Sequence, residues 1–440
     1  MSTEAKNGIN WVAVVTMMFL CGMIAFVTYL GQPLSNVWKA QEAIKNSTML
    51  AMLGNAMVFV AYLFMGIPAG KLLGRVGYKK TALIGIAAGF VAMAVQLVSG
   101  KLPMDGGVAL PYGVYLVGGF IGGISACLLN MVVNPMLNLL GGGGKRGNQL
   151  NMAGMTFNSL TATVTPLIVG SLIGAVTAET TMADCDLLMY IALAVFAVSF
   201  VIISLIAIKD PEQAVVTEKI GAFAPLRFRH CLLGVLAIFA YMGVEAGIPG
   251  VMTQWLNSEG GPLAATGNAA AIAGSVVAVY WLLMFIGRLI GAAIGGKVSS
   301  RMMMTVTTLA AILFIVIGTA TTGIQAKMPG ITTEGGFSVR MVEVPLAAVF
   351  FALCGLCASV MWPAIFNLAT EKLGKYTAAA SGLFMTMVVG GGIFQVIQGV
   401  VCDNFSYMVS FIVPGLALAY IFVYAVGFSK PAANIEELVK

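Results

Sequence analysis

Apolar runs of 18 or more residues, each long enough to cross a membrane, recur along the whole chain and limit the folds it can adopt. Hydrophobic residues make up 59% of the sequence and charged residues only 9%, whereas soluble domains carry roughly 25% charged residues. A helix of about 20 apolar residues spans the bilayer core and pairs all its backbone groups within the segment. The sequence therefore predicts an all-α, multi-pass membrane protein.

The apolar runs divide into two sets of six, each run being long enough for one transmembrane helix. We expect helices at about 10–31, 47–72, 79–99, 109–140, 148–177, 186–208, 231–256, 266–297, 301–323, 342–370, 377–402 and 407–428. The longest charged and polar stretch separates the sixth run from the seventh. It predicts two six-helix bundles, at 1–208 and 231–440, joined by a linker at 209–230.

Lys and Arg are distributed unevenly between the two sides of this topology. Most of the 23 lie near the termini, in the linker, or in loops on the same side as these. The other side carries Lys39, Lys45, Lys101, Lys327 and Arg340. By the positive-inside rule, we expect both termini and the linker in the cytoplasm and the helices in a cell inner membrane.

The remaining composition argues against several other classes of protein. The net charge of +6 forms no basic stripe, so no nucleic-acid partner is expected. No basic segment precedes the first apolar run, so we expect no removable signal peptide. Most of the seven cysteines lie in apolar runs and should pack as small residues, with a Cys185–Cys402 disulfide as an alternative. We find no metal site, no catalytic group and no cofactor motif.

Residues 129–160 combine two apolar helices with side-chain amides and a glycine run. Asn130, Asn134 and Asn158 each offer a hydrogen-bond donor and an acceptor. An amide in hydrocarbon is costly unless something pairs with it, so we expect these three to face a cavity that holds a polar solute. The alternative is hydrogen bonding between helices, and for Asn134 the neighbouring Pro135 also suggests a helix kink.

The loop after the second predicted helix carries a recognisable motif, Gly70-Lys-Leu-Leu-Gly-Arg-Val-Gly-Tyr-Lys-Lys80. It resembles the Gly-x-x-x-Asp-Arg-x-Gly-Arg-Lys signature of the major facilitator transporters, with Gly74 in place of the Asp. Two six-helix bundles with a cytoplasmic linker are also the plan of that family. The resemblance implies the major facilitator fold, with a solute site between the bundles near the middle of the membrane.

Further segments resemble one branch of that family. The segments Asn130-Met-Val-Val-Asn134-Pro135 and Asn151-Met-Ala-Gly-Met155-Thr-Phe-Asn158-Ser are similar to Glu-Thr-Ala-Ala-Asn-Pro and Asn-x-x-Gln-x-Phe-Asn-Ser. Those patterns belong to the fucose permease and glucose/galactose permease family of sugar:proton symporters. Similar segments follow in the same order around Glu245, Arg288, Trp362 and Gln395. The resemblance implies a sugar transporter.

The chain departs from that family at three positions. Gln32 precedes Pro33 where the family has an Asp, Asn130 replaces a Glu, and Met155 replaces a Gln. Amides can hydrogen-bond a sugar hydroxyl but cannot release a proton near neutral pH. The resemblance therefore implies that Gln32 and Asn130 bind the sugar, and leaves open whether protons drive transport.

Two charged residues within the predicted helices need a separate explanation. Glu245 is the acid nearest the middle of any predicted helix, where an ionised carboxylate costs about 2.5–3.5 kcal/mol. It is the proton-coupling candidate, and the alternative is a structural acid that braces helices. Arg288 is expected near the cytoplasmic end of its helix, where its stem reaches water and it braces the helix rather than binding solute.

The second bundle supplies amides and aromatic rings that suit a sugar. Aromatic faces stack on the apolar side of a pyranose while amides bind its rim. The candidates here are Gln254, Trp255, Trp362, Asn367, Gln395 and Gln398. For Trp255 the alternative is an anchor at the membrane interface.

We therefore expect a secondary transporter, not an enzyme, that moves a neutral monosaccharide by alternating access and works as a monomer. Its partners would be the sugar, membrane lipid and, if transport is coupled, protons. Alternatives on the same plan are a facilitator, or a carrier of an amino sugar, a nucleoside or an organic anion. An anion carrier should place a cation at mid-membrane, where Arg288 is not expected. From another class, a transport-dead membrane sensor would explain the replaced carboxylates.

Overall fold

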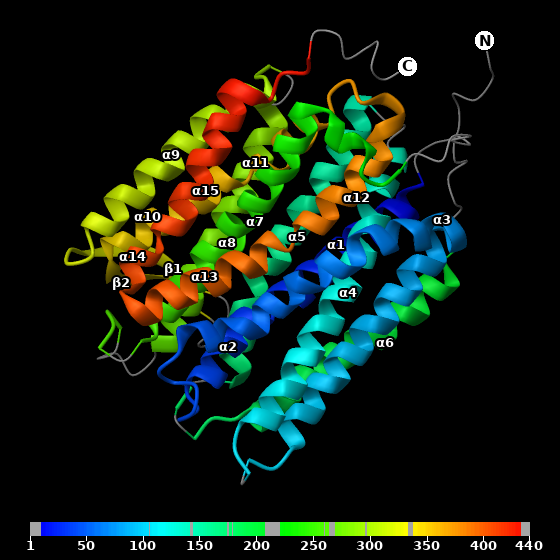
Figure 1. Cartoon of the computed structure of the whole chain (residues 1–440). Helices are drawn as coiled ribbons and strands as arrows, with labels where there is room; N and C mark the ends of the chain where they lie inside the picture. Colours follow the sequence, from blue (N-terminus) through cyan, green and yellow to red (C-terminus); the bar gives the residue numbers. More distant parts are fainter. Residues whose placement is uncertain are drawn as a thin grey trace, which may run out of the picture.

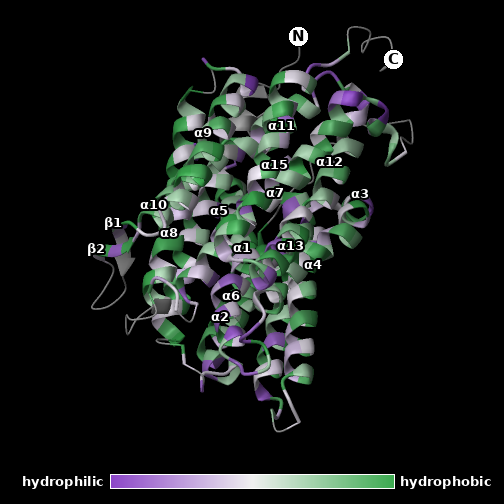
Figure 2. Cartoon of the chain, turned by 60° about the vertical axis from the view of Figure 1, so that its left-hand side comes forward, coloured by the Kyte–Doolittle hydropathy of each residue, from purple (hydrophilic) through white to green (hydrophobic). Residues whose placement is uncertain are grey.

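The computed structural model describes residues 10–104, 106–140, 144–173, 176–177, 179–206, 221–258, 260–263, 269–294, 297–332 and 338–432. Long helices run side by side through the molecule, and one two-stranded hairpin lies at its edge (Figure 1). Apolar residues cover the middle of the helices, while hydrophilic residues gather toward the two ends (Figure 2). This distribution is the one that a membrane-spanning bundle requires.

The helices fall into an N-terminal and a C-terminal half. The N-terminal half contains α1 (Trp11–Tyr29), α2 (Gly31–Lys39), α3 (Thr48–Lys101), α4 (Ala109–Leu140), α5 (Gly144–Ile173), the 3₁₀ helix η1 (Met182–Cys185) and α6 (Asp186–Leu205). The C-terminal half contains η2 (Ala224–Arg227), α7 (Arg229–Leu256), α8 (Ala269–Ile294), α9 (Ser300–Ala320), β1 (Gln325–Thr332), β2 (Ser338–Pro345), α10 (Leu346–Ala358), α11 (Met361–Ala369), η3 (Gly374–Tyr376), α12 (Thr377–Met387), α13 (Gly390–Asn404), α14 (Tyr407–Ser410), α15 (Ile412–Val423) and the π-helical turn η4 (Tyr424–Phe428).

The described helices supply twelve membrane spans, as predicted. Eleven continuous helical stretches are long and apolar enough to cross a membrane. One of them, α3, has 54 residues and contains two spans, because Gly77 interrupts it with φ 80° and ψ 175°. Only glycine adopts such a backbone without strain. Most of the predicted linker, up to residue 220, lies outside the described residues.

The prediction of a helix over 342–370 is wrong at its start and misses an interruption. Residues 338–345 form β2, which pairs antiparallel with β1 from Gln325↔Pro345 to Thr332↔Ser338. Exposed Glu343 lies between partly buried Val342 and buried Val344, an alternation typical of a strand, and Pro345 holds extended backbone before α10 begins. The helical span then breaks between α10 and α11, and a similar break separates α12 from α13. All seven cysteines are free, so the Cys185–Cys402 alternative is also wrong.

The two halves meet mainly where α3 packs against α12 and α13 and where α5 packs against α8. Glycines allow the close approach of α3 and α13. A Cβ atom at Gly391 would lie 2.6 Å from Phe59 Cδ1, and one at Gly392 would lie 2.6 Å from the main-chain oxygen of Ala56. No larger side chain fits at these two positions, so the glycines allow the two helices to pack closely.

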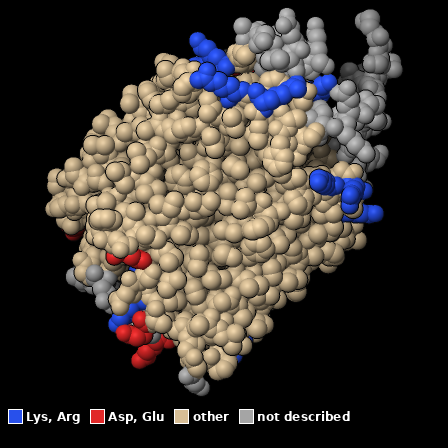
Figure 3. All heavy atoms as spheres, in the orientation of Figure 1, with Lys and Arg blue, Asp and Glu red and all other residues tan. Residues whose placement is uncertain are grey.

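Helix α1 begins and η4 finishes at one end of the molecule, which we call the terminal end (Figure 1). The opposite end carries α2 and the hairpin, and we call it the distal end. On the face shown in Figure 3, most Lys and Arg gather at the terminal end, and Asp and Glu lie toward the distal end. This asymmetry is the spatial counterpart of the uneven basic residues in the sequence.

A carboxylate joins the two halves at the distal end. Asp403, at the end of α13, accepts hydrogen bonds from the backbone nitrogens of Thr48 (2.6 Å) and Met49 (3.1 Å) and from the Ser47 hydroxyl (2.9 Å). These donors belong to the first turn of α3, whose free N–H groups and dipole favour a negative charge. Lys39 Nζ donates to Thr48 Oγ1 at 2.8 Å. The N-terminus of a helix in one half is thus capped by an acid from the other half.

Asp403→Ala should loosen the distal contact between the halves. Losing these bonds at a partly exposed site is expected to shift the ratio of distally open to distally closed molecules by about 1–2 kcal/mol, a factor of about 5–30. A Met52→Cys reporter, on the α3 face that packs against Gly250 of α7, should react faster with a membrane-impermeant maleimide. Asp186→Ala is the matched control, because Asp186 pairs with Lys101 inside one half. Equal labelling in both variants would contradict this role of Asp403.

Candidate functional site

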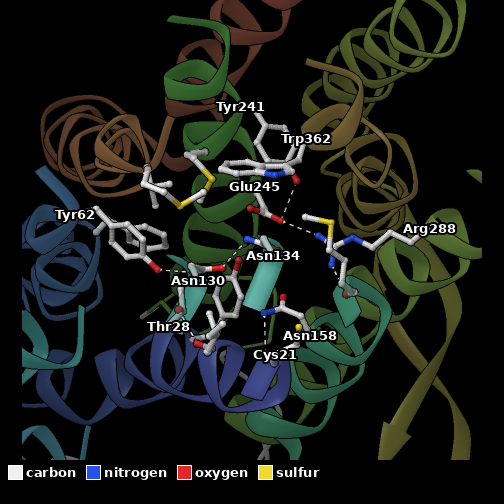
Figure 4. A pocket seen from close by; sticks show the side chains of 17 residues that line it. Cys21, Thr28, Tyr62, Asn130, Asn134, Asn158, Tyr241, Glu245, Arg288 and Trp362 are labelled. Carbon is white, nitrogen blue, oxygen red and sulfur yellow. Dashed lines mark hydrogen bonds and ion pairs between the residues drawn. The ribbon is translucent and has the colours of Figure 1, made fainter. Parts of the chain in front are cut away.

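A cavity of about 660 Å³, measured up to its open mouth, lies between the two halves. Its walls come from α1, α3, α4 and α5 on one side and from α7, α8, α11 and α12 on the other (Figure 4). The breaks between α10 and α11 and between α12 and α13 lie at its level, since Trp362 and Val388 both line it.

The amides Asn130, Asn134 and Asn158 form one wall of this cavity (Figure 4). Asn130 and Asn134 are four residues apart and therefore share one face of α4. Asn134 Nδ2 donates to Asn130 Oδ1 at 3.5 Å, and Asn130 Nδ2 donates to the Tyr62 hydroxyl at 2.8 Å. Asn158 Nδ2 donates to the main-chain oxygen of Cys21 at 3.0 Å. Each of the three amide nitrogens therefore has one of its two N–H groups bonded within the protein.

The acceptors of this wall remain available. Among the described residues, no donor reaches Asn134 Oδ1 or Asn158 Oδ1, and neither atom is buried without a partner. Both oxygens therefore face the cavity, where they can accept hydrogen bonds from a solute that carries hydroxyl groups. Neither purely structural role weighed for these amides, interhelical bonding or helix kinking, accounts for these two unused oxygens.

The opposite wall carries an acid and two aromatic rings. Tyr241 and Glu245 lie four residues apart on α7, and the Tyr241 hydroxyl donates to Glu245 Oε1 at 2.9 Å. The Tyr241 and Trp362 rings pack with their centroids 6.0 Å apart. Glu245 Oε2 has no hydrogen bond among the described residues. Pro249 cannot donate to the Glu245 main-chain oxygen, and the Tyr280 hydroxyl does so at 3.3 Å instead.

The Arg288 side chain lies buried in the cavity wall, so the prediction that it reaches water at the end of its helix is wrong. Its side chain is 7% exposed, and Nη2 contacts Glu245 Oε1 at 3.3 Å. Nη1 donates to the main-chain oxygen of Met155 and to the Ser159 hydroxyl, each at 2.6 Å. Met155 and Ser159 of α5 thus supply the hydrogen-bond acceptors that the prediction expected from water. Glu245 is consequently one member of a buried ion pair.

Four predicted substrate residues lie outside the lining of this cavity in the present structure. Gln254 donates to Ser35 and Asn36 across the halves, at 2.7 and 3.2 Å. Gln395 donates to the main-chain oxygen of Ala246 at 3.1 Å and accepts from Asn55 at 3.1 Å. Gln398 packs against Gly247.

Gln32, the fourth, lines a second cavity of about 540 Å³. Its Nε2 donates to the main-chain oxygen of Ala246 at 3.5 Å. Tyr29 lines both cavities, and its ring packs against that of Trp281 with centroids 4.2 Å apart. An aromatic pair therefore lies where the two cavities meet. Two further candidates have other surroundings: Trp255 packs on Phe351 and Asn367 is exposed.

The cavity also contains residues that sequence reasoning missed. Thr28, Tyr62 and Tyr241 contribute hydroxyl groups to its lining. A threonine within an apolar helix usually bonds to its own backbone, as Thr28 does to Ile24 at 2.7 Å, so the sequence gave no signal for it. The hydroxyls of Tyr62 and Tyr241 instead contact Asn130 and Glu245, partners that depend on the fold or on helix spacing. Within the described part of the chain, no group of three His, Cys, Asp or Glu residues could hold a metal ion.

Arg288→Met should destabilise the protein because it leaves the Glu245 carboxylate buried without its cation. Breaking a buried pair from one side costs about 3–5 kcal/mol, whereas replacing both members by neutral groups is often tolerated. We expect a clear fall in the thermal midpoint of the detergent-purified protein, and recovery of most of it in Glu245→Gln/Arg288→Met. Arg301→Met, which removes a contact to Ser429 away from the cavity, is the control. A double variant as unstable as Arg288→Met would contradict the pairing.

Comparison with known proteins agrees with this architecture. The family model described as Major Facilitator Superfamily matches residues 12–394. A glucose/galactose transporter of Brucella abortus is 28% identical over 437 residues, covering 98% of this chain and 96% of the relative. The L-fucose-proton symporter of Escherichia coli is 23% identical over 422 residues, covering 90% and 88%.

A solved structure shows the same fold. The crystal structure of the Escherichia coli fucose:proton symporter FucP superposes with a TM-score of 0.64, at 19% identity, over 94% of this chain and 98% of that one. The family model covers most of the chain, and both halves take part in the structural match. The chain belongs to the Major Facilitator Superfamily.

Proposed function

We propose that this protein is a sugar:proton symporter that carries a neutral monosaccharide through the cavity between its halves. The observation that carries the proposal is the unused pair of amide oxygens, Asn134 Oδ1 and Asn158 Oδ1, facing a cavity between two six-helix bundles. The transporters named for glucose/galactose and for fucose with protons, to which the chain is similar over most of its length, support the same class of solute.

The chemistry of the two walls suits a sugar ring. A pyranose carries hydroxyl groups around its rim, and each hydroxyl can donate to an amide oxygen. Its C–H face is apolar and can stack on an aromatic ring such as Trp362. The remaining lining includes Met155, Met242 and Met385, whose flexible side chains adapt to irregular shapes.

Glu245 is the residue we propose for proton coupling. It is the one acid in the lining of the central cavity, and its Oε2 has no hydrogen bond among the described residues. Gln32 and Asn130 stand at the positions where the similar family has acids, and amides cannot carry a proton at neutral pH. A proton taken up from the cavity therefore has one carboxylate to occupy.

An organic anion is a less suitable solute, although Arg288 lies in the cavity. The guanidinium is already compensated by Glu245 at 3.3 Å, so the pair presents no net positive charge. A bound anion would have to compete with that carboxylate. The open amide oxygens would also repel a carboxylate, because both are acceptors only.

We further propose that the terminal end faces the cytoplasm of a cell whose inner membrane holds the protein, that lipid surrounds it, and that a single chain suffices for transport. The basic residues concentrated at that end support the orientation (Figure 3). The solute cavity is lined by the helices of one chain. We also propose residues 209–230 as the linker between the halves.

Asn158→Ala should weaken sugar binding while leaving the fold intact. Losing a hydrogen bond to the solute costs about 1–2 kcal/mol, so the KM for uptake into proteoliposomes should rise by about 5–30-fold. Radiolabelled D-glucose, D-galactose and L-fucose form the panel. Asn404→Ala is the matched control, because Asn404 is exposed and bonds only within its own helix. An unchanged KM in Asn158→Ala would remove this residue from the site.

Glu245→Gln should abolish uphill uptake driven by a pH gradient but preserve counterflow exchange of sugar. The amide keeps an acceptor for Tyr241 and Arg288 but has no site for the transported proton. Both activities are measured in the same proteoliposomes with labelled sugar. Full accumulation in this variant, or uptake by the unaltered protein that a protonophore leaves unchanged, would exclude proton coupling through Glu245.

A further inference from the structure

The second cavity continues the path of the central cavity toward the distal end. Helix α1 runs away from the terminal end, and Tyr29, its last residue, lines both cavities (Figure 1). Gln32 and Asn36, which follow on α2, line the second cavity. On α7, Glu245 lines the central cavity and Thr253 the second. A solute that enters from the distal end therefore meets the second cavity first.

Two contacts between the halves bound this second cavity. At its distal edge, Gln254 Nε2 donates to Asn36 Oδ1 at 3.2 Å, and Asn36 and Thr253 both line the cavity. At its inner edge, the buried rings of Tyr29 on α1 and Trp281 on α8 pack with their centroids 4.2 Å apart. Each contact joins the N-terminal half to the C-terminal half. The second cavity is thus a compartment between an outer polar contact and an inner aromatic contact.

One wall of the second cavity carries amide atoms that are available to a ligand. Gln32 is 5% exposed, and its Nε2 lies 3.5 Å from the main-chain oxygen of Ala246, longer than a usual hydrogen bond. Within the described part of the chain, no donor reaches Gln32 Oε1, and Asn36 Nδ2 donates to no acceptor. Neither atom is buried without a partner, so both face the cavity. The wall therefore offers one acceptor and one donor.

The facing wall is apolar and leaves space. It comes from α5 and α8 and includes Val169 and Val277. A Cβ atom at Gly170 would meet no described atom within 4 Å, and one at Gly274 would lie 3.7 Å from the main-chain oxygen of Pro166. Like the central cavity, the second cavity combines side-chain amides, a tryptophan ring and apolar side chains, so the same class of solute suits both.

We propose that the second cavity is a second site for the neutral monosaccharide, occupied after the distal contact opens and before Tyr29 and Trp281 separate. This inference rests on the proposed function. One hydroxyl of the sugar donates to Gln32 Oε1, and another accepts from Asn36 Nδ2. The apolar face of the ring stacks on Trp281. From there the solute moves to the amides of the central cavity.

A wholly apolar ligand, such as a lipid chain, suits the second cavity less well. It would match Val169 and Val277, but it would cover Gln32 Oε1 and Asn36 Nδ2 without bonding to them. Amide atoms that lose water and gain no partner cost free energy. Among the described residues that line this cavity, none carries a formal charge, so an ion gains no counter-charge there.

Two cysteine reporters distinguish the two sites. Gly274→Cys places a thiol in the second cavity, and Met385→Cys places one in the central cavity. N-ethylmaleimide labels both in proteoliposomes, and mass spectrometry of the peptide that holds each reporter separates its label from that on the seven native cysteines. A sugar of the panel that is taken up should slow labelling at both reporters.

Two further substitutions should shift protection at the two reporters independently. Asn158→Ala should raise the sugar concentration for half protection by about 5–30-fold at Met385→Cys and leave it unchanged at Gly274→Cys. Gln32→Ala should do the reverse. A common shift at both reporters would show that Gly274→Cys senses only the central site, and would overturn the inference. So would unprotected Gly274→Cys at a sugar concentration that fully protects Met385→Cys.

Filling the second cavity tests its place on the path. Gly170→Leu adds a side chain whose Cβ enters open space, so sugar uptake should slow by about tenfold or more. Half protection at Met385→Cys should need the same sugar concentration as before, because the central site is untouched. Gly415→Leu on α15, where a Cβ also meets no described atom within 4 Å, is the matched control. Normal uptake by the Gly170→Leu variant would contradict the proposed path.

The same measurements separate this inference from the proposed function. Sugar uptake with protection at Met385→Cys alone would leave the symporter in place and remove the second site. Failure of the unaltered protein to take up any sugar of the panel, with no protection at either reporter, would overturn the proposed function and this inference with it.

Discussion

The cost of an unpaired polar group in hydrocarbon governs where this chain places its polar side chains. A bilayer offers no water to satisfy them, so each must bond to another group or face a wet cavity. The central amides satisfy the rule by bonding one N–H group of each within the protein and turning two oxygens to the cavity. Arg288 satisfies most of it through α5 and Glu245.

The Glu245–Arg288 ion pair illustrates why the sequence predicts the class of protein more easily than the positions of the site residues. Apolar run length and the uneven Lys and Arg predicted the helices and the two halves, because these features depend on the bilayer itself. The spacing of Asn130 and Asn134 predicted a shared helix face. The position of Arg288 could not be obtained in this way, because its depth depends on the acceptors that α5 of the other half provides.

The other differences between prediction and structure have similar tertiary causes. The end of the strand, residues 342–345, was predicted as helix because it directly precedes an apolar run, and its pairing with β1 is what makes it a strand. Gln254 and Gln395 were predicted as amides that face a solute, yet both bond across the halves. An amide that faces water and one that crosses an interface look the same in a sequence.

The distal contact between the halves is polar where a permanent interface would be apolar. Its bonds join Asp403 to the first turn of α3 and Gln254 to Ser35 and Asn36, while glycines bring α13 close to α3. Water can replace such bonds at modest net cost, whereas separating interdigitated apolar side chains would expose them. Gln398 also weakens this contact, because its amide oxygen and nitrogen are both buried without a partner in this arrangement. Their desolvation opposes the closed state and offsets part of what the other bonds contribute, so the interface stays weak enough to open.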